Sequence, residues 1–381
     1  MHIAEALFWI SLAGLFYVYA GYPLLLVILA PFVHRRRSEV DFTPQLSVLI
    51  AAYNEEVGIR RKIEQTLALD YPADLLEILV LSDGSTDRTD AIVESFRDPR
   101  VRLLHVPGRK GKTNAQNEGV KIARGDVLIF SDATTIYHPQ ALRHLASNYG
   151  DPKVGAVSGR YQYFDPVGQS PTGLGTIAFW NYENLIKRMQ SRIYTITGCC
   201  GCIYSVRREA YSALAPDVIS DLVQPLHVIR GGYRVVFDDR ALAYEETTQS
   251  TSEEFSMRVR VITRGIHGLL SVPDLLTPWK FGWVSFQLWS HKLLRWLVPL
   301  FLLVLLGSNF FLWQSFYYSA FLAAQVGFYL IALLSVVLPF HRRWKPLGIP
   351  LYFCTLNAAA FCSLIEVLRR RKYVVWETVR T

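Results

Sequence analysis

Charged residues are scarce in this sequence. Only 19% of its 381 residues are Asp, Glu, Lys or Arg, whereas 51% are hydrophobic. Because soluble globular domains carry about 25% charged residues, this scarcity excludes an ordinary soluble protein. The apolar excess lies near both ends of the chain, which favours a membrane protein with a polar segment in the middle.

A disulfide framework is also excluded. Of the five cysteines, three are packed too closely along the chain for ordinary disulfide geometry, and the other two lie in an apolar segment. No further ligand at a suitable spacing accompanies them, which argues against a zinc site. We interpret the three close cysteines as small packing residues: Cys199, Cys200 and Cys202.

The net charge of +8 does not indicate a nucleic-acid partner. The Lys and Arg residues collect in short clusters beside apolar segments, at 34–37, 341–343 and 369–372. Such clusters are typical of the cytoplasmic flanks of membrane helices rather than of a nucleic-acid groove. We therefore expect a lipid bilayer, and no nucleic acid, as a partner.

An N-terminal transmembrane helix is predicted within residues 1–38. The run from Leu7 to Val33 contains no charge, and it exceeds the roughly 20 residues that cross a bilayer. A signal peptide is the alternative, but the basic cluster follows the run and no small-residue cleavage site is present. The flank predicts an outside N-terminus and a cytoplasmic chain from about residue 34.

Residues 39–250 have the pattern of a cytoplasmic α/β domain. Short apolar runs alternate with polar, helix-like stretches, as in Leu46–Ala51, Glu55–Leu69 and Ile78–Leu81. This alternation predicts parallel strands with crossover helices.

The C-terminal third is predicted to be membrane-associated. Aromatic and cationic residues in 251–295 favour helices in the membrane interface, with a soluble amphipathic helix packed on the domain as the alternative. Residues 296–368 contain three apolar spans, followed by a basic cytoplasmic tail at 369–381. Four crossings would place that tail outside, so either 347–367 is not a simple crossing or the stretch from 281 is divided differently.

Acidic side chains follow the predicted strands. Asp83 ends one strand and Asp132 ends another, where α/β sheets bind ligands. Between them, the glycine- and cation-rich segment 108–119 suits a diphosphate but does not have the spacing of a Walker A loop. A separate acidic segment carries Asp221, and together Asp132 and Asp221 suit a metal–diphosphate anchor and a general base.

The order of these segments resembles the glycosyltransferases of family 2, which have the GT-A fold with a mixed central sheet. The resemblance covers about residues 45–265 and is closest to membrane-embedded synthases of bacterial polysaccharides, such as hyaluronan, chitin-oligosaccharide and cellulose synthases. The matching segments are Ala51–Glu55, Asp83–Asp87, Gly111–Lys112 with Ala115 and Asn117, Ser131–Ala133, Gly198 and Gly201 with Arg207–Arg208, Asp221, and Gly231–Arg234.

The resemblance implies a role for each matching residue. The uridine would lie against Ala51, Tyr53, Glu55 and Asp83. The diphosphate and its Mg²⁺ or Mn²⁺ ion would be held by Lys112 and Asp132, with Asp132 as the metal ligand. Asp221 would be the general base, and Gly198 and Arg264 would lie near the acceptor or the diphosphate.

Three departures from the family pattern stand out. The second aspartate of the metal-binding DxD motif is replaced by Thr134, and the acidic residue before the base is replaced by Ser220. The QxxRW motif of processive synthases retains its arginine, but Val261 and Gly265 replace the glutamine and the acceptor-stacking tryptophan. The last departure puts processive synthesis in question.

The C-terminal tail resembles the Trp-Gly-Thr-Arg motif of hyaluronan synthases, with one extra residue. Trp376, Thr378 and Arg380 are the matching positions, and they would close over the nucleotide. The alternative is an interfacial tryptophan on a basic tail.

The resemblance therefore implies an enzyme of the bacterial inner membrane. It would transfer a sugar from a UDP-sugar, with inversion, to a saccharide or lipid-linked acceptor. Processive synthesis with export and a single addition to a polyprenyl-linked intermediate both remain open. A catalytically silent sugar-nucleotide sensor or scaffold is the reading from another functional class.

Overall fold

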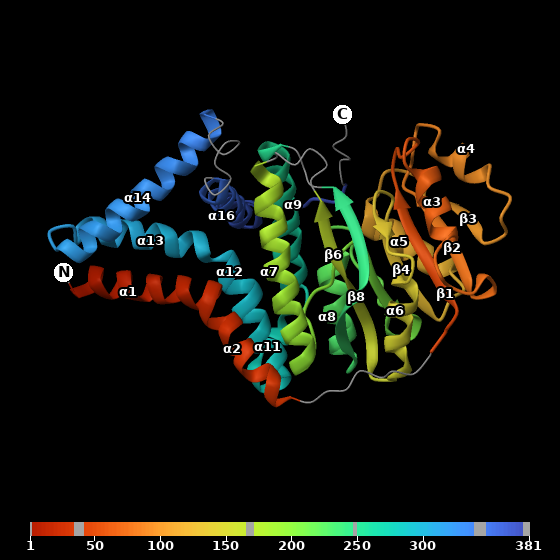
Figure 1. The fold of residues 1–381 in the computed structure, drawn as a ribbon, viewed down its shortest axis with the longest axis horizontal. Coiled ribbons are helices and arrows are strands. Elements are labelled where there is room, and N and C mark those ends of the chain that lie inside the picture. The colour runs from red at the N-terminus through yellow and green to blue at the C-terminus, as the bar shows by residue number, and fades with distance from the viewer. Residues whose placement is uncertain (1, 34–41, 165–170, 247–249, 339–347, 376–381) are drawn as a thin grey trace.

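The computed structural model describes residues 2–33, 42–164, 171–246, 250–338 and 348–375. An eight-stranded mixed sheet forms its centre, in the order β3-β2-β1-β4-β7-β6-β8-β5 (Figure 1). The strands are β1 (Leu46–Ala52), β2 (Leu76–Ser82), β3 (Val101–His105), β4 (Val127–Asp132), β5 (Ile136–Tyr137), β6 (Val154–Phe164), β7 (Ile203–Arg207) and β8 (Arg234–Glu246).

The sheet has a parallel half and a mixed half. Strands β3, β2, β1 and β4 are parallel, whereas β7 runs antiparallel to both β4 and β6. At the far edge β6 and β8 are parallel, and β5 pairs antiparallel with β8. The predicted mixed α/β architecture is confirmed, and its parallel half lies where the sequence alternates between apolar runs and helices.

Helices cover both faces of the parallel half, which explains why its central strands are apolar throughout. In β1, Val48 and Ile50 face a core shared with α3 and α6, while Leu49 faces a core shared with α5 and α8. All seven residues of β1 are buried. The covering helices are α3 (Ile59–Leu67), α4 (Thr89–Glu94), α5 (Lys112–Ile122), α6 (Ala141–Ser147) and α8 (Ser220–Arg230).

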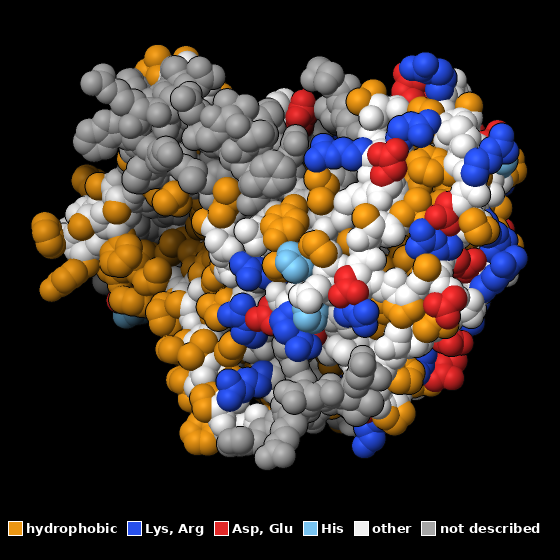
Figure 2. Space-filling model, turned by 45° about the vertical axis from the view of Figure 1, so that its right-hand side comes forward, with side chains coloured by type: hydrophobic (Ala, Val, Ile, Leu, Met, Phe, Trp, Pro, Cys, Tyr) orange, Lys and Arg blue, Asp and Glu red, His pale blue; other side chains and the backbone are white. Residues whose placement is uncertain are grey.

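The remaining helices lie on the other side of the molecule from β1–β4 (Figure 1). Figure 2 shows hydrophobic side chains gathered toward the left of the molecule, and charged side chains spread over its right. The remaining helices are α1 (His2–Phe16), α2 (Tyr22–Leu29), α7 (Pro171–Ile193), α9 (Thr251–Leu270), α10 (Pro278–Phe281), α11 (Trp283–Leu288), α12 (Leu294–Trp296), α13 (Val298–Phe311), α14 (Phe316–Val337) and α16 (Gly348–Leu368).

Three helices in the described residues are long and apolar enough to cross a membrane: His2–Phe32, α14 and α16. The predicted span at 296–314 is not an independent helix of that length. Its α13 has 14 residues and qualifies only together with Trp283–Trp296, from which it is bent by 56°. The bend falls at the boundary that the sequence suggests between the interface and membrane segments.

The segment predicted to lie in the interface is partly buried against protein. Helix α9 contacts α8 and α16, and its Arg264, Ile266 and Leu269 are buried. Trp279 and Trp289, by contrast, are 87% and 45% exposed. Helix α9 thus packs on both the domain and the candidate membrane helix α16, and an interfacial position stays a prediction for 251–295.

Candidate functional site

The candidate site begins where three parallel strands end together. The register pairs Ala51 of β1 with Asp132 of β4 and pairs Ala52 with Ser82 of β2. The residues that follow these ends, including Tyr53 and Asp83, are therefore brought to one edge of the sheet. This is the edge at which α/β sheets bind ligands.

Asp83 organises a loop at this edge. Its buried carboxylate accepts hydrogen bonds from the backbone N–H groups of Lys110, at 3.0 Å, and Gly111, at 2.8 Å. Burial raises the pKa of Asp83, although the two backbone donors lower it. A carboxylate has about four acceptor sites, so Asp83 retains capacity for a further N–H donor such as a nucleobase.

The other predicted nucleoside contacts lie around this loop. The Arg109 guanidinium stacks over the Tyr53 ring, 4.1 Å from its centroid. Ala51 and Glu55 are buried, and the Glu55 backbone N–H donates to the Thr89 hydroxyl at 2.7 Å. The structure thus brings all four predicted nucleoside residues to the ends of β1 and β2.

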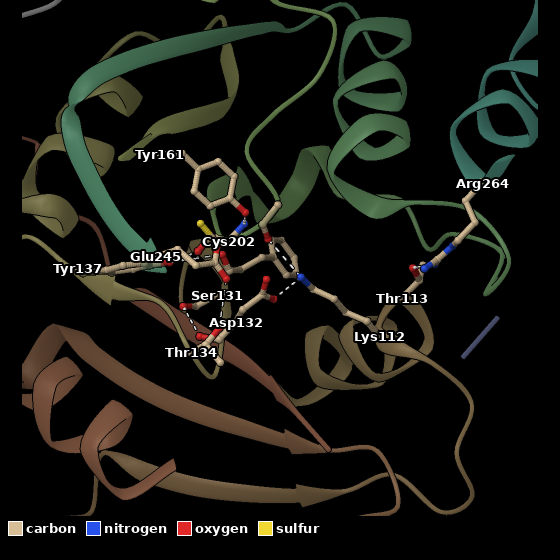
Figure 3. Close-up of polar contacts among 12 residues, drawn as sticks. Lys112, Thr113, Ser131, Asp132, Thr134, Tyr137, Tyr161, Cys202, Glu245 and Arg264 are labelled. Carbon is tan, nitrogen blue, oxygen red and sulfur yellow. Dashed lines mark hydrogen bonds and ion pairs between the residues drawn. The ribbon is translucent and has the colours of Figure 1, made fainter. Parts of the chain in front are cut away.

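Lys112 connects the strand end to the neighbouring loop. Its ammonium forms an ion pair with Asp132 and also donates to the Gly201 carbonyl at 3.3 Å (Figure 3). Burial lowers the pKa of Lys112, but the opposite charge of Asp132 outweighs it, and the pKa lies above its ordinary value. The ammonium is therefore charged and placed where anionic oxygens would arrive.

A carboxylate that the sequence does not reveal lies beside Asp132. Thr134, at the second acidic position of the DxD motif, donates a hydrogen bond of 3.2 Å to Glu245 of β8 (Figure 3). No local pattern marks Glu245, because β8 reaches this place only through the curl of the sheet. Its carboxylate adds a hard oxygen donor of the kind that Mg²⁺ and Mn²⁺ prefer.

These donors fit a divalent cation that is also held by a ligand. Within the described ranges, no three His, Cys, Asp or Glu side chains gather as a metal site. Asp132 and Glu245 would supply two carboxylate ligands to the cation, and the diphosphate of the donor would supply the others. The turn after Asp132 is held by Lys62, which donates to the Thr135 carbonyl at 2.6 Å. Burial lowers the pKa of Lys62 to about 8.

Asp221 lies near Gly201 and within electrostatic range of Lys112, on a different helix. It lies in the first turn of α8, and its carbonyl accepts from the Cys199 N–H at 2.8 Å. A Cβ atom on Gly201 would lie 2.8 Å from its Oδ2 atom. Burial raises the pKa of Asp221, although Lys112 and Lys187 lower it. A carboxylate with a raised pKa suits a general base.

The segment Gly198–Cys202 lies against Asp221, and we call this segment the floor of the site. Its cysteines are buried, and burial raises the pKa of Cys199 and Cys202, which leaves them as neutral packing groups as predicted. A Cβ atom on Gly198 would lie 3.3 Å from Leu222 Cδ1, which directly follows Asp221. The structure thus brings the predicted Gly198 and Asp221 together.

Arg264 lies apart from the Lys112–Asp132 pair (Figure 3). Its buried guanidinium donates to the carbonyls of Val218 at 2.5 Å and Pro216 at 3.3 Å, and to the Thr113 hydroxyl at 3.1 Å. Burial lowers its pKa to about 10. These contacts fix the loop before Asp221, so the predicted position of Arg264 at the diphosphate or acceptor stays a prediction.

Trp376 and Arg380 lie outside the described residues, but the chain before them reaches the site. The Lys372 ammonium forms an ion pair with Asp217, at 2.6 Å. A Cβ atom on Gly111 would overlap the Val374 carbonyl. Residues 372–374 therefore run along the edge of the sheet that carries the predicted nucleoside contacts.

Comparisons with known proteins agree with this geometry. The family model described as glycosyl transferase family 2 matches residues 47–215. The chain is 28% identical over 234 residues to the probable glycosyltransferase YdaM of Bacillus subtilis, covering 59% of this chain and 56% of that protein. It is 25% identical over 373 residues to the poly-beta-1,6-N-acetyl-D-glucosamine synthase of Staphylococcus epidermidis, covering 90% of this chain and 89% of that protein.

The fold also matches a solved structure along almost its whole length. The mannosyltransferase PcManGT from Pyrobaculum calidifontis, solved in complex with GDP-Man and Mn²⁺, superimposes with a TM-score of 0.72. The match covers 95% of this chain and 99% of that protein at 21% identity. At this identity the likeness shows the fold, including the arrangement of helices beside the sheet.

Proposed function

We propose that this chain, whose residues 47–215 match the family 2 glycosyltransferases and whose fold is that of a GT-A enzyme, transfers a sugar from a UDP-sugar with inversion at C1. The acceptor is a hydroxyl of a saccharide or of a lipid-linked saccharide. The reaction takes place at the bacterial inner membrane.

One observation carries this proposal: the donor anchor and the base meet at Gly201. The Lys112 ammonium contacts both Asp132 and the Gly201 carbonyl, while Asp221 Oδ2 lies 2.8 Å from the position of a Cβ atom on the same glycine. A donor diphosphate at Asp132 and Lys112 and an acceptor at Asp221 would therefore be neighbours. Inverting transfer needs this arrangement, because the base and the leaving group act on opposite sides of C1.

The residues have distinct tasks in the transfer. Tyr53, Glu55 and Asp83 hold the uridine, and Lys112 stabilises the negative charge that develops on the leaving diphosphate. Asp221 accepts the proton of the acceptor hydroxyl as its oxygen bonds to C1. A divalent cation at Asp132, with Glu245 nearby, would supply further charge neutralisation of the diphosphate.

We infer the membrane arrangement from the side of the membrane on which the C-terminal tail must lie. Helix α16 is seen nearly end-on in Figure 1, whereas α1 and α13 lie along the plane of the picture. We assign the crossings to His2–Phe32, α13 with its bent partner, and α14, with α16 at the membrane surface. Three crossings from an outside N-terminus leave residues 369–381 inside, which is consistent with the contact between Lys372 and Asp217.

Nucleotide release tests the proposal. The full-length protein in detergent is incubated with a panel of UDP-sugars and Mn²⁺ or Mg²⁺, and UDP is measured. We expect Asp221→Asn to reduce release by roughly 10²-fold to 10⁴-fold, the range of general base catalysis. Asp217→Asn is the matched control, since Asp217 lies four residues earlier and pairs with the tail.

The same experiment separates the alternatives. Unchanged UDP release by Asp221→Asn would contradict the assignment of the base. Nucleotide binding without any release by the wild-type protein would favour the sensor. The length of the product, read by mass spectrometry, distinguishes processive synthesis from a single addition.

A further inference from the structure

Lys292 extends from the bent membrane-side helices to the floor of the site. It lies on the π-helical turn Trp289–Leu293, between α11 and α12. Its Nζ atom is 3.7 Å from the position of a Cβ atom on Gly198. Among the described residues, no carboxylate forms an ion pair with this ammonium, although Asp221 and Glu183 are within electrostatic range.

A second ammonium lies beside the same floor. Lys187 of α7 is only 4% exposed, donates to the Cys200 sulfur at 3.1 Å and lies 5.4 Å from the centroid of the Trp180 ring. A thiol does not balance a positive charge. The neighbouring Glu183 is already paired with Arg295 and contacts His291 at 3.2 Å.

Lys112, Lys187 and Lys292 all lie within electrostatic range of Asp221, so the cations around this floor outnumber its one carboxylate. A buried charge without a counter-charge is costly, and a bound anion would relieve that cost. A neutral sugar polymer would not relieve that cost, because it brings no negative charge.

The ammonium of Lys292 and the carboxylate of Asp221 lie at opposite ends of one short segment. Lys292 meets Gly198, and Asp221 meets Gly201. Only two residues lie between these glycines, so their α-carbons are at most about 10 Å apart. An acceptor whose hydroxyl lies at Asp221 would thus place beside Lys292 a group that is about one sugar residue from that hydroxyl.

Trp296 completes this side of the site. It follows Lys292 by four residues, on α12, and its ring lies 3.2 Å from the position of a Cβ atom on Gly265. Leu222 lies between Gly198 and Gly265, because one of its methyl groups approaches each glycine. The indole therefore occupies the space that a side chain at position 265 would take, and offers a flat apolar surface to a sugar ring or a lipid chain.

We propose that Lys292, Lys187 and Trp296 form an acceptor subsite that binds the phosphate-bearing end of a lipid-linked saccharide. This inference rests on the proposed glycosyl transfer and specifies its acceptor. The helices that carry Lys292 and Trp296 continue into α13, which gives the lipid chain an apolar path along the bent pair.

In the transfer, the acceptor hydroxyl oxygen forms a bond to C1 of the donor sugar and its proton moves to Asp221. The bond between C1 and the diphosphate oxygen breaks, and its electron pair leaves with UDP. The acceptor's own phosphate is unchanged and serves to anchor the substrate.

The test compares acceptors in the full-length protein. Initial rates are measured with a monosaccharide linked through diphosphate to a polyprenyl chain, with the same monosaccharide as a neutral alkyl glycoside, and with the soluble sugar phosphate. The measured quantity is the ratio of kcat/KM for the diphospholipid to kcat/KM for the neutral glycoside.

We expect the wild-type protein to prefer the diphospholipid, and Lys292→Met to lower the ratio by about 10-fold to 100-fold, the value of a charge-assisted hydrogen bond. Lys292→Arg should retain most of the preference. Lys280→Met is the control, because this lysine is exposed and lies one short helix away. A polyprenyl phosphate should compete with the diphospholipid in the wild-type protein, which gives a readout that needs no variant.

A ratio that is unchanged in Lys292→Met, a wild-type preference for the neutral glycoside, or an absence of competition would overturn the inference. Equal use of the soluble sugar phosphate would overturn its lipid part. Each of these results leaves UDP release intact, whereas a wild-type protein that releases no nucleotide with any donor would instead overturn the proposed function.

Discussion

The donor side and the acceptor side of the site are built by different means. On the donor side, Asp83 and Asp132 stand at the ends of β2 and β4, the two parallel strands that flank β1, and local turns hold them. On the acceptor side, Gly198, Asp221 and Lys292 come from three separate parts of the chain and meet only through packing. The first construction is local in sequence and the second is not.

This difference indicates which residues determine the choice of acceptor. In the proposed function, the strand ends give one nucleotide-binding edge that many sugar donors could share. The acceptor side depends on which membrane-side residues reach the floor, and here they include an ammonium and an indole. Donor binding and acceptor choice should therefore respond to different substitutions.

The largest effect is expected at the glycine that joins the two sides. Gly201→Ala places a Cβ atom 2.8 Å from Asp221 Oδ2, so the carboxylate must move. Since a misplacement of about 1 Å can cost 10²-fold in rate, we expect kcat to fall by roughly that factor with the donor KM nearly unchanged.

Steady-state kinetics with Gly327→Ala as the control checks this, because no atom lies within 4 Å of a Cβ atom there. An equal loss in both variants, or a rise in the donor KM alone, would mean that the two sides do not meet at Gly201.

A smaller effect, with a distinct pH signature, is expected from Lys112→Met. Asp221 must be ionised to accept a proton, so kcat rises with pH through its pKa, which burial raises. Lys112 lowers that pKa, so its removal should shift the acid limb of the kcat profile to higher pH. Donor affinity should also fall by about 10-fold, because a charged contact to the diphosphate is lost.

Lys110→Met is the matched control, because Lys110 contacts Asp83 through its backbone N–H. A pH profile that is identical in the wild type and Lys112→Met would separate Lys112 from the acceptor side and break the comparison.

The smallest effect on donor binding is expected from Arg264→Met. Its guanidinium holds the Val218 and Pro216 carbonyls, so the free energy of unfolding should fall by about 2 kcal/mol. The donor KM should stay constant while kcat declines. Chemical denaturation and kinetics together check this, and a raised donor KM with unchanged stability would instead support a contact with the diphosphate.

The sequence allowed the meeting of the strand ends at one edge to be predicted, because the signals for it are local. Apolar runs that end in Tyr53, Asp83 and Asp132 indicate parallel strands, and parallel strands end at a common edge. The mixed sheet and the apolar helices followed from the same patterns and from the resemblance.

The contacts between distant parts of the chain could not be predicted in the same way, on either side of the site. Glu245 reaches Thr134 across 111 positions of the chain, and Trp296 covers Gly265 from another helix. No periodicity in the sequence encodes such contacts, since they depend on the curl of the sheet and on the 56° bend before α13. That bend also explains why 296–314 does not form a single straight helix that is long enough to cross a membrane by itself.

The central claim is that Asp221 acts as the base opposite a leaving group held at Asp132 and Lys112. The anomeric configuration of the product, measured by NMR after transfer from an α-linked UDP-sugar, tests it most directly. The account predicts a β-linked product, formed by the wild-type protein and lost in Asp221→Asn. An α-linked product would contradict it, because retention requires a different role for the acidic group at C1.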